Sequence, residues 1–333
     1  MNMNFDAVYF EPDILKYELG QMLRKKYDEL PWTPIESHNR IPEFSNASNK
    51  EFPKLKQHLI IGIRKTHKYS ANEKVSNWLV PYTSSGCRAM CLYCYLVCNY
   101  NKCAYLRLFV NREQMMDKIL KTDATSAVPQ TFEIGSNSDL VLENRITDNL
   151  IWTIERFSKE GRGSLTFPTK FDMVQPLLSL DHRGKIIFRM SVNPVEIIRR
   201  IEIGTSPLSS RIQALNDMAE AGYPVGLLIA PVILLPEWKK LYGELVEQLA
   251  DSLSNKVKKT GFIEIILMTY SFVHNAINTE AFPNAVNLYD RSQMTGRGRG
   301  KYSYRTDARE DTQEYLREKL SKCLGSMPIL YIS

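Results

Sequence analysis

The sequence lacks any long apolar run. No stretch reaches the roughly 18 consecutive apolar residues that a membrane-spanning helix needs. The first residues, MNMNFDAVYFEPDI, carry acidic side chains where a secretory signal peptide has a basic end followed by an apolar stretch. We therefore expect a cytosolic (cytoplasmic) protein with no membrane contact.

Cysteine is scarce and unevenly placed. The chain of 333 residues has 6 cysteines, and five of them fall within SSGCRAMCLYCYLVCNYNKC, residues 84–103. Cytosolic thiols are kept reduced, so such a cluster is more typical of metal binding or catalysis than of disulfide bonds. This window is therefore the first candidate for a functional site.

Neither sign of charge is in large excess. The formal net charge is +6, which is compatible with a polyanionic partner but is shared by many proteins that have none. Hydrophobic residues make up 44% of the chain, which is enough for a large core. Charge alone therefore identifies no partner.

Strand-like runs alternate with helical ones from about residue 76 onward. The strand-like runs include TFEIGS, GSLTFPTK, KIIFRMSVN, PVGLLIAPVI and GFIEIILMTY. This alternation predicts an α/β fold, most simply a partial (β/α)6 TIM-type barrel with its chemistry at the carboxyl ends of the strands. We predict one domain in three parts: an N-terminal extension over 1–75, the barrel over 76–272, and a C-terminal β-hairpin and helix over 273–333.

Three of the cysteines in the window, Cys87, Cys91 and Cys94, have the spacing CxxxCxxC. Three thiolates this close can bind one inorganic cluster, and three ligands leave one iron of a 4Fe-4S cluster open. An open iron can coordinate S-adenosyl-L-methionine and pass an electron into its sulfonium. The alternative is a zinc site completed by Cys98 or Cys103, although structural zinc usually takes two ligand pairs separated by a longer loop.

The cysteine spacing, followed by an aromatic residue, resembles the signature of the radical S-adenosylmethionine superfamily. From about residue 80 to the end, the chain also resembles the spore photoproduct lyase family, in the order and spacing of CLYCYL, FEIGSNSD, LTFPTKF, RGKIIFRMSVNP, GTSPLSSRIQALNDMAEAGYPVGLLIAPVI and GRGKYSYR. The resemblance implies a radical lyase with a 4Fe-4S cluster and S-adenosyl-L-methionine. Through a 5'-deoxyadenosyl radical, such an enzyme returns a thymine dimer in DNA to two thymines.

The resemblance also implies roles for single residues. It places Ser138, Lys170 and Ser191 in contact with S-adenosyl-L-methionine, each at the end of a predicted barrel strand. Lys170 suits a carboxylate and the hydroxyls suit a ribose. Without the resemblance, Ser138 would be interpreted as part of a helix cap or turn and Lys170 as an exposed charge.

Two tyrosines flank the last cysteine of the motif. By resemblance, Tyr93 and Tyr95 line the cavity and relay a hydrogen atom, although such residues are more often packing residues. The chain departs from the family at Ser136 in EIGSNSD, where well-known members carry the cysteine that donates a hydrogen atom to the repaired thymine radical. Serine does not substitute there, because an O–H bond is much stronger than an S–H bond.

Cys98, with Cys103 behind it, is the alternative hydrogen donor in this window. Its other interpretation is a small buried hydrophobe, which is what a free cysteine commonly is. A third option is a radical enzyme of the same family that acts on another substrate.

A lesion inside a duplex must be flipped out to reach a buried cluster. The segment TGRGRGKYSYR has glycines for a tight hairpin, cations for phosphates and tyrosines for stacking, and the resemblance implies a DNA-inserting hairpin here. An isolated segment of this kind is more commonly a flexible loop. The candidate DNA contacts are Arg297, Arg299, Lys301, Tyr302, Tyr304 and Arg305, with Arg64, Lys65 and Lys68 as weaker additions.

The implied partners are double-stranded DNA containing a thymine dimer and a reductant whose identity the sequence does not reveal. We expect a monomer.

Overall fold

The computed structural model describes residues 4–99 and 105–333, with residues 98 and 99 as backbone only. The chain divides into two compact units. Unit 1 comprises Met1–Ala89, Leu96–Phe167 and Leu180–Lys185, and unit 2 comprises Met90–Tyr95, Pro168–Ser179 and Ile186–Ser333. Cys87 therefore belongs to unit 1, whereas Cys91 and Cys94 belong to unit 2.

A five-stranded sheet in unit 1 has the order β2-β1-β3-β8-β6, parallel except for β6. Leu59 and Ile61 are two residues apart, as are Leu106 and Leu108, so both pairs point to one face of the sheet and pack with α1 in a buried cluster. The strands are β1 (Ala7–Phe10), β2 (Trp32–Pro34), β3 (His58–Gly62), β6 (Ser84–Ser85) and β8 (Leu106–Phe109). The residues predicted as an N-terminal extension thus supply β1, β2 and β3.

A second set of paired strands in unit 1 comprises β4, β5, β9 and β10, and all of these pairs are parallel except β4 with β5. The strands are β4 (Ser70–Ala71), β5 (Trp78–Leu79), β9 (Thr131–Glu133) and β10 (Ser164–Thr169), whose last two residues lie in unit 2. The helices of unit 1 are α1 (Glu18–Lys26), α2 (Pro42–Ser45), α3 (Phe52–Leu55), α4 (Leu96–Asn99), α5 (Arg112–Thr125), α6 (Leu140–Thr147) and α7 (Asn149–Glu160), with 3-10 turns η1 (Pro12–Lys16) and η2 (Asn49–Glu51).

Unit 2 is built on four parallel strands in the order β11-β13-β14-β18. They are β11 (Ile186–Val192), β13 (Val225–Val232), β14 (Phe262–Leu267) and β18 (Ile329–Ile332). The sequence of β13, VGLLIAPV, is almost continuously apolar because a parallel strand is buried on both faces. The connecting elements are η3 (Gln175–Leu177), α8 (Val195–Arg200), α9 (Leu208–Glu220), α10 (Trp238–Ser252), α11 (Asn255–Thr260) and α13 (Thr306–Leu324).

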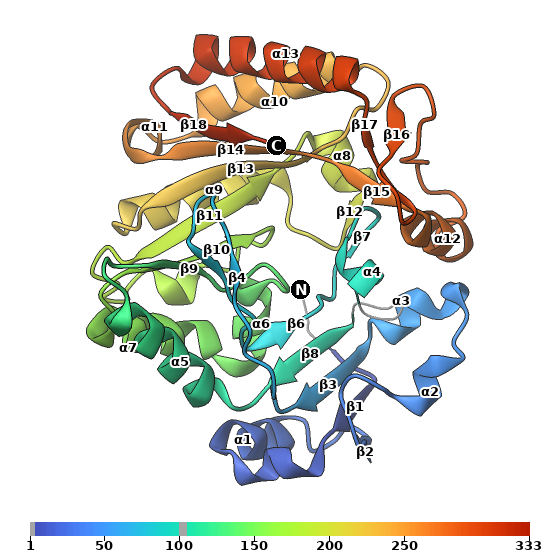
Figure 1. Ribbon diagram of the computed structural model, residues 1–333, viewed down its shortest axis with the longest axis vertical. Helices are drawn as coiled ribbons and strands as arrows, with labels where there is room; N and C mark the ends of the chain where they lie inside the picture. Colours follow the sequence, from blue (N-terminus) through green and yellow to red (C-terminus); the bar gives the residue numbers. More distant parts are fainter. Residues whose placement is uncertain (1–3, 100–104) are drawn as a thin grey trace. The chain divides into compact units, whose positions relative to one another are not determined.

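Helices α10 and α13 lie side by side on this sheet (Figure 1), and the rings of Trp238 and Tyr315 meet edge to face at 5.4 Å. Helix α13 has 19 residues but is strongly charged along its length. Within the described ranges, no helix combines the length and the apolar character that crossing a membrane requires.

Two small sheets complete unit 2. In the first, β7 (Met90–Cys91) pairs antiparallel with β12 (Glu202–Ile203). In the second, β15 (Thr269–Ser271), β17 (Lys301–Tyr304) and β16 (Met294–Gly296) form an antiparallel sheet next to α12 (Phe272–Ala281). We call β16, β17, the turn 297–300 between them and Arg305, which directly follows β17, the hairpin. The turn is tight because Gly298, Arg299 and Gly300 all adopt positive φ, which glycine tolerates best.

Candidate active site

The cysteine loop, residues 90–95, is fixed by backbone hydrogen bonds within unit 2. Cys91 stands opposite Glu202 in the β7–β12 pair, the Leu92 N–H donates to the Ile201 carbonyl at 3.0 Å, and the Cys94 N–H donates to the Cys91 carbonyl at 3.1 Å. Cys91 and Cys94 are half-buried thiols. The loop therefore brings Cys91 next to Glu202 of β12 and carries Cys94 three residues further along.

The third sulfur of the motif belongs to unit 1. Cys87 is half-buried, its Sγ accepts a hydrogen bond from the Ala89 N–H at 3.4 Å, and its carbonyl accepts from Lys56 Nζ at 2.5 Å. Among the residues that the structure describes, no three His, Cys, Asp or Glu side chains form a ready group for a single metal ion. The cluster ligands therefore stay a prediction.

Glu202 is the centre of a buried polar cluster in unit 2. Its carboxylate accepts hydrogen bonds from Lys170 Nζ at 2.8 Å and Asn193 Nδ2 at 2.9 Å, and Arg211 Nη2 lies 2.7 Å away. Burial alone would raise the pKa of Glu202, but the charges of Lys170 and Arg211, with hydrogen bonds from Lys170 and Tyr93, outweigh it and lower the pKa to about 2. The carboxylate is therefore ionised at neutral pH.

Lys170 follows β10, and the fold brings it to Ser191 on β11. Lys170 Nζ donates to Ser191 Oγ at 2.6 Å and to the Ala230 carbonyl at 2.8 Å, in addition to Glu202. An ammonium group has three N–H donors, so all three are used. Lys170 is thus not the exposed charge that its position at a strand end would suggest. Lys170 and Ser191, two of the residues predicted to contact S-adenosyl-L-methionine, lie within hydrogen-bond distance of each other.

The two tyrosines of the cysteine loop differ in their surroundings. The Tyr93 hydroxyl donates to Glu202 Oε1 at 2.5 Å, and burial, followed by the negative charge of Glu202, raises the pKa of Tyr93 well above its usual value. Tyr95 is 51% exposed. Tyr93 is therefore tied into the polar cluster, while Tyr95 faces outward.

The other predicted ligand contact, Ser138, lies in unit 1. Ser84 Oγ is 2.6 Å from both Ser138 Oγ and Glu143 Oε2, and Ser138 bridges in parallel with Gly86, the residue before Cys87. The pKa of Glu143 is raised, because the effect of burial exceeds the opposite effect of the hydrogen bonds that its neighbours donate. The side chain of Asp139 accepts from the Leu142 N–H at 3.2 Å and caps α6, so the cap is formed by the residue that follows Ser138.

The structure does not describe two of the predicted thiol side chains. The backbone of Cys98 is part of α4, but its side chain is not described, and neither is Cys103. Ser136 lies on the segment between β9 and α6 in unit 1 and is partly buried.

The hairpin exposes most of its predicted DNA contacts. Arg297, Arg299, Lys301 and Arg305 are exposed and Tyr302 is half-buried. Tyr304 differs from the prediction, because it is 4% exposed and its hydroxyl accepts from the Leu234 N–H at 2.9 Å. Tyr304 therefore packs the base of the hairpin.

Arg64 is another residue with a structural role. Its Nε donates to the Tyr82 carbonyl at 2.8 Å, and its guanidinium lies 3.9 Å from the centroid of the Phe109 ring. These contacts account for Arg64 without a nucleic acid.

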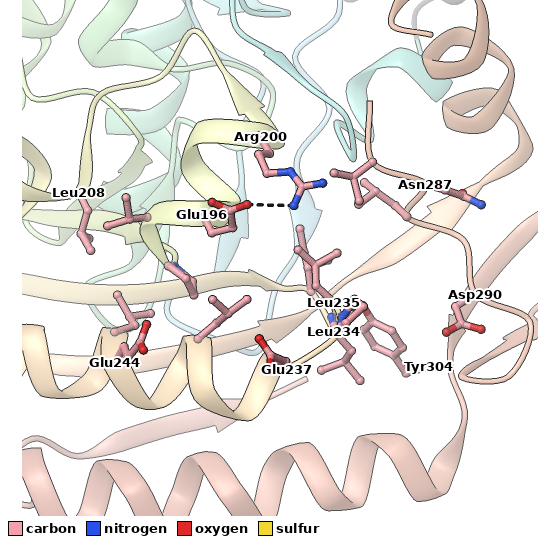
Figure 2. Close-up of a pocket in the computed structure, with 18 of the residues that line it drawn as sticks. Glu196, Arg200, Leu208, Leu234, Leu235, Glu237, Glu244, Asn287, Asp290 and Tyr304 are labelled. Atoms are coloured by element: carbon pink, nitrogen blue, oxygen red, sulfur yellow. Dashed lines mark hydrogen bonds and ion pairs between the residues drawn. The ribbon is translucent and has the colours of Figure 1, made fainter. Parts of the chain in front are cut away.

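A cavity of about 790 Å³ lies in unit 2 (Figure 2). Its charged lining residues are Arg200, which pairs with Glu196 at 2.9 Å, and the carboxylates of Glu237, Glu244 and Asp290. This excess of negative charge repels phosphate groups. We therefore do not assign the cavity to DNA.

Sequence reasoning missed Asn193, Glu202 and Arg211. Asn193 is two residues from Ser191 on an extended segment, and this spacing could have indicated a shared face. Glu202 and Arg211 gave no such signal, because a charged residue is usually solvated and only packing reveals that these two are buried together.

The parallel strands and their connecting helices define the class of the protein as α/β, and unit 2 holds a cysteine loop beside a buried lysine–glutamate cluster. The family model described as Spore photoproduct lyase matches residues 3–333. The chain belongs to the spore photoproduct lyase family, which confirms the resemblance and the predicted fold class.

Curated relatives and solved structures agree. The chain is 32% identical to the spore photoproduct lyase of Bacillus subtilis (strain 168), covering 98% of this chain and 97% of the relative. It is 30% identical to that of Geobacillus sp. (strain Y412MC61), covering 98% of each. A spore photoproduct lyase complexed with dinucleoside spore photoproduct aligns over 100% of both chains, with a TM-score of 0.92 and 27% identity. A mutant with bound AdoMet and the same dinucleoside has a TM-score of 0.91 and 27% identity, covering 99% of each chain.

Proposed function

We propose that this chain is a radical S-adenosyl-L-methionine lyase that returns the spore photoproduct in DNA to two thymines. Family membership over residues 3–333 and the similar solved structures with bound dinucleoside and AdoMet support the reaction. The observation that carries it is the pairing of Cys91 with Glu202, because this pairing puts the cysteine loop beside Lys170 and Ser191.

The proposed cofactors are a 4Fe-4S cluster on Cys87, Cys91 and Cys94 and one S-adenosyl-L-methionine. Half-buried thiols of this spacing have the donor chemistry that iron–sulfur clusters require, and the Ala89 N–H directed at Cys87 Sγ is the kind of hydrogen bond that tunes them. When bound, and supplied with one electron by an external reductant, the two cofactors would provide the chemistry of hydrogen-atom abstraction from the lesion.

Lys170, Ser191 and Ser138 are the proposed contacts to S-adenosyl-L-methionine. All three donors of Lys170 are already used, so a carboxylate ligand takes the place of one acceptor. Glu202 is the acceptor that stays, because it is fully buried and its charge needs the lysine. Ser191 and the Ala230 carbonyl are the exchangeable partners.

The hairpin is the proposed DNA contact. Arg297, Arg299, Lys301 and Arg305 are exposed cations that can neutralise phosphates, and Tyr302 offers a ring for stacking. The lesion would be flipped out of the duplex, which costs least where pairing is already damaged. An external reductant supplies the electron, and we propose a monomer as the working form.

The hydrogen atom that completes repair needs a donor other than Ser136. Tyr93 is bound to Glu202, whereas Tyr95 is exposed and Cys98 follows on α4. We therefore propose that Cys98 or Tyr95 donates the hydrogen atom to the repaired thymine radical. Tyr93, which the polar cluster holds in place, is a proposed relay.

Ser136 also favours a second candidate, a radical enzyme of this family with another substrate. Turnover of dinucleoside spore photoproduct by the anaerobically reconstituted protein separates the two. Formation of thymidine supports the lyase. Formation of 5'-deoxyadenosine without any thymidine supports the other substrate.

A further inference from the structure

Helix α12 contacts the cysteine loop through two side-chain hydrogen bonds. His274 Nε2 donates to the Cys94 carbonyl at 2.9 Å, and Asn278 Nδ2 donates to the Leu92 carbonyl at 2.7 Å. The two residues are four positions apart, so they lie on one face of the helix. His274 is 3% exposed, and this burial shields its hydrogen bond from water.

The same two side chains contact the strand that carries the hairpin. The ring of Tyr270 on β15 lies 5.1 Å from the ring of His274, and its hydroxyl lies 3.2 Å from Asn278 Nδ2. Tyr270 is paired with Tyr302 of the hairpin in the antiparallel β15–β17 ladder. One face of α12 therefore touches both the cysteine loop and the sheet of the hairpin.

A second contact joins the start of α12 to the turn of the hairpin. The Phe272 N–H donates to the Gly300 carbonyl at 3.1 Å, and the Phe272 ring meets the Tyr302 ring edge to face at 5.3 Å. The Phe272 side chain is 61% exposed, so a bound duplex could cover it. The turn of the hairpin is thus connected to α12 by a backbone hydrogen bond and by a ring contact.

We propose that His274 and Asn278 are positioning residues that hold the cysteine loop, and that DNA bound at the hairpin stabilises the loop through α12. This inference rests on the proposed function, because it takes the hairpin as the DNA site. The carbonyls of Leu92 and Cys94 are main-chain acceptors whose hydrogen-bond partners come from α12, so losing these donors loosens the loop.

Hydrogen exchange of the loop amides in the apo protein tests the inference without any activity. With the parent, a short duplex containing the spore photoproduct should slow exchange at residues 90–95. Asn278→Ala should speed this exchange about three- to tenfold, the range expected for one hydrogen bond, and should abolish the effect of the duplex. Asn275→Ala, an exposed asparagine on the same helix, is the matched control and should behave like the parent.

Two variants at His274 extend the test. His274→Ala should act like Asn278→Ala, and His274→Gln, which keeps an N–H at similar reach, should restore much of the parental protection. If circular dichroism shows that His274→Ala does not fold, the hydrogen-exchange rates of Asn278→Ala and His274→Gln test the proposal instead. In catalysis, both alanine variants should form more 5'-deoxyadenosine per lesion repaired.

The proposed role of α12 would be overturned if the loop amides of both alanine variants exchanged at the parental rate. It would also be overturned if Asn275→Ala sped up this exchange as much as Asn278→Ala does. A duplex that leaves exchange in the parent unchanged would overturn the coupling. If the parent protects its loop on duplex binding but repairs no lesion, the proposed substrate fails while the inference about α12 stands.

Discussion

Lys170 Nζ lies 2.8 Å from the carboxylate of Glu202, whose side chain is 0% exposed. The lysine comes from the end of β10 and the glutamate from β12, which pairs with the cysteine loop. This ion pair therefore links a proposed ligand contact to the proposed cluster ligands. Removing one charge of a buried pair leaves the other uncompensated, which costs several kcal/mol.

We expect Glu202→Gln to weaken binding of S-adenosyl-L-methionine about tenfold, because Lys170 loses the anion that orients it. Titration calorimetry of the reconstituted protein measures this. Glu264→Gln is the matched control, since Glu264 is equally buried and pairs with Arg189 at 3.2 Å on β11 and β14. Equal weakening by both variants would mean that general destabilisation, and not positioning of Lys170, explains the loss.

The pKa of Glu202 predicts a loss of stability in acid. The folded state lowers this pKa from its usual 4.5 to about 2, so the ionised carboxylate stabilises the fold above pH 4.5. That stabilisation, at most roughly 3 kcal/mol, is lost as the pH falls through the window between these values. Urea unfolding of the apo protein across this window should show a steeper decline for the parent than for Glu202→Gln. Parallel curves would contradict the prediction.

Each of the variants Cys87→Ala, Cys91→Ala and Cys94→Ala should lose the brown colour and the iron and sulfide of the anaerobically reconstituted protein, because a three-cysteine site has no spare ligand. Cys323→Ala, which removes a half-buried thiol on α13, should keep them. Elemental analysis decides the matter. Zinc in the parent in place of iron and sulfide would reject the cluster.

Ser136→Cys should increase the yield of repaired thymidine per 5'-deoxyadenosine by about threefold or more, because it supplies the weaker S–H bond at the family position. Cys98→Ala should lower the same ratio if that thiol returns the hydrogen atom. Chromatographic product analysis measures both. A Cys98→Ala variant that matches the parent in rate and product would leave Tyr95 as the remaining proposed donor.

Arg299→Ala and Lys301→Ala should each weaken binding to duplex DNA and reduce the slope of log K against log salt by about 0.9, the value for one phosphate contact. Fluorescence anisotropy over a salt series gives the slope. Lys259→Ala, an exposed lysine on α11, should leave it unchanged. If both hairpin variants kept the parental slope of log K against log salt, the hairpin would not be the site of DNA binding.

The sequence by itself determined the parts of this protein that depend on local pattern. Alternating apolar periods predicted the parallel α/β architecture, and glycines in TGRGRG predicted a tight turn that the structure shows at 298–300 with positive φ. The spacing of Cys87, Cys91 and Cys94, with the resemblance of later segments, predicted the family. The sequence alone reveals these features because periodicity and motif spacing depend only on residues that are close together in the chain.

Only the tertiary structure decided which charges and rings are buried. Glu202 is 32 residues from Lys170 in the chain, so no local pattern could have paired them. Tyr304 looked like its neighbour Tyr302, yet Tyr304 is enclosed against Leu234 while Tyr302 is only half-buried. Burial depends on how distant elements pack, and it is burial that turns a lysine, a glutamate and a histidine into positioned groups.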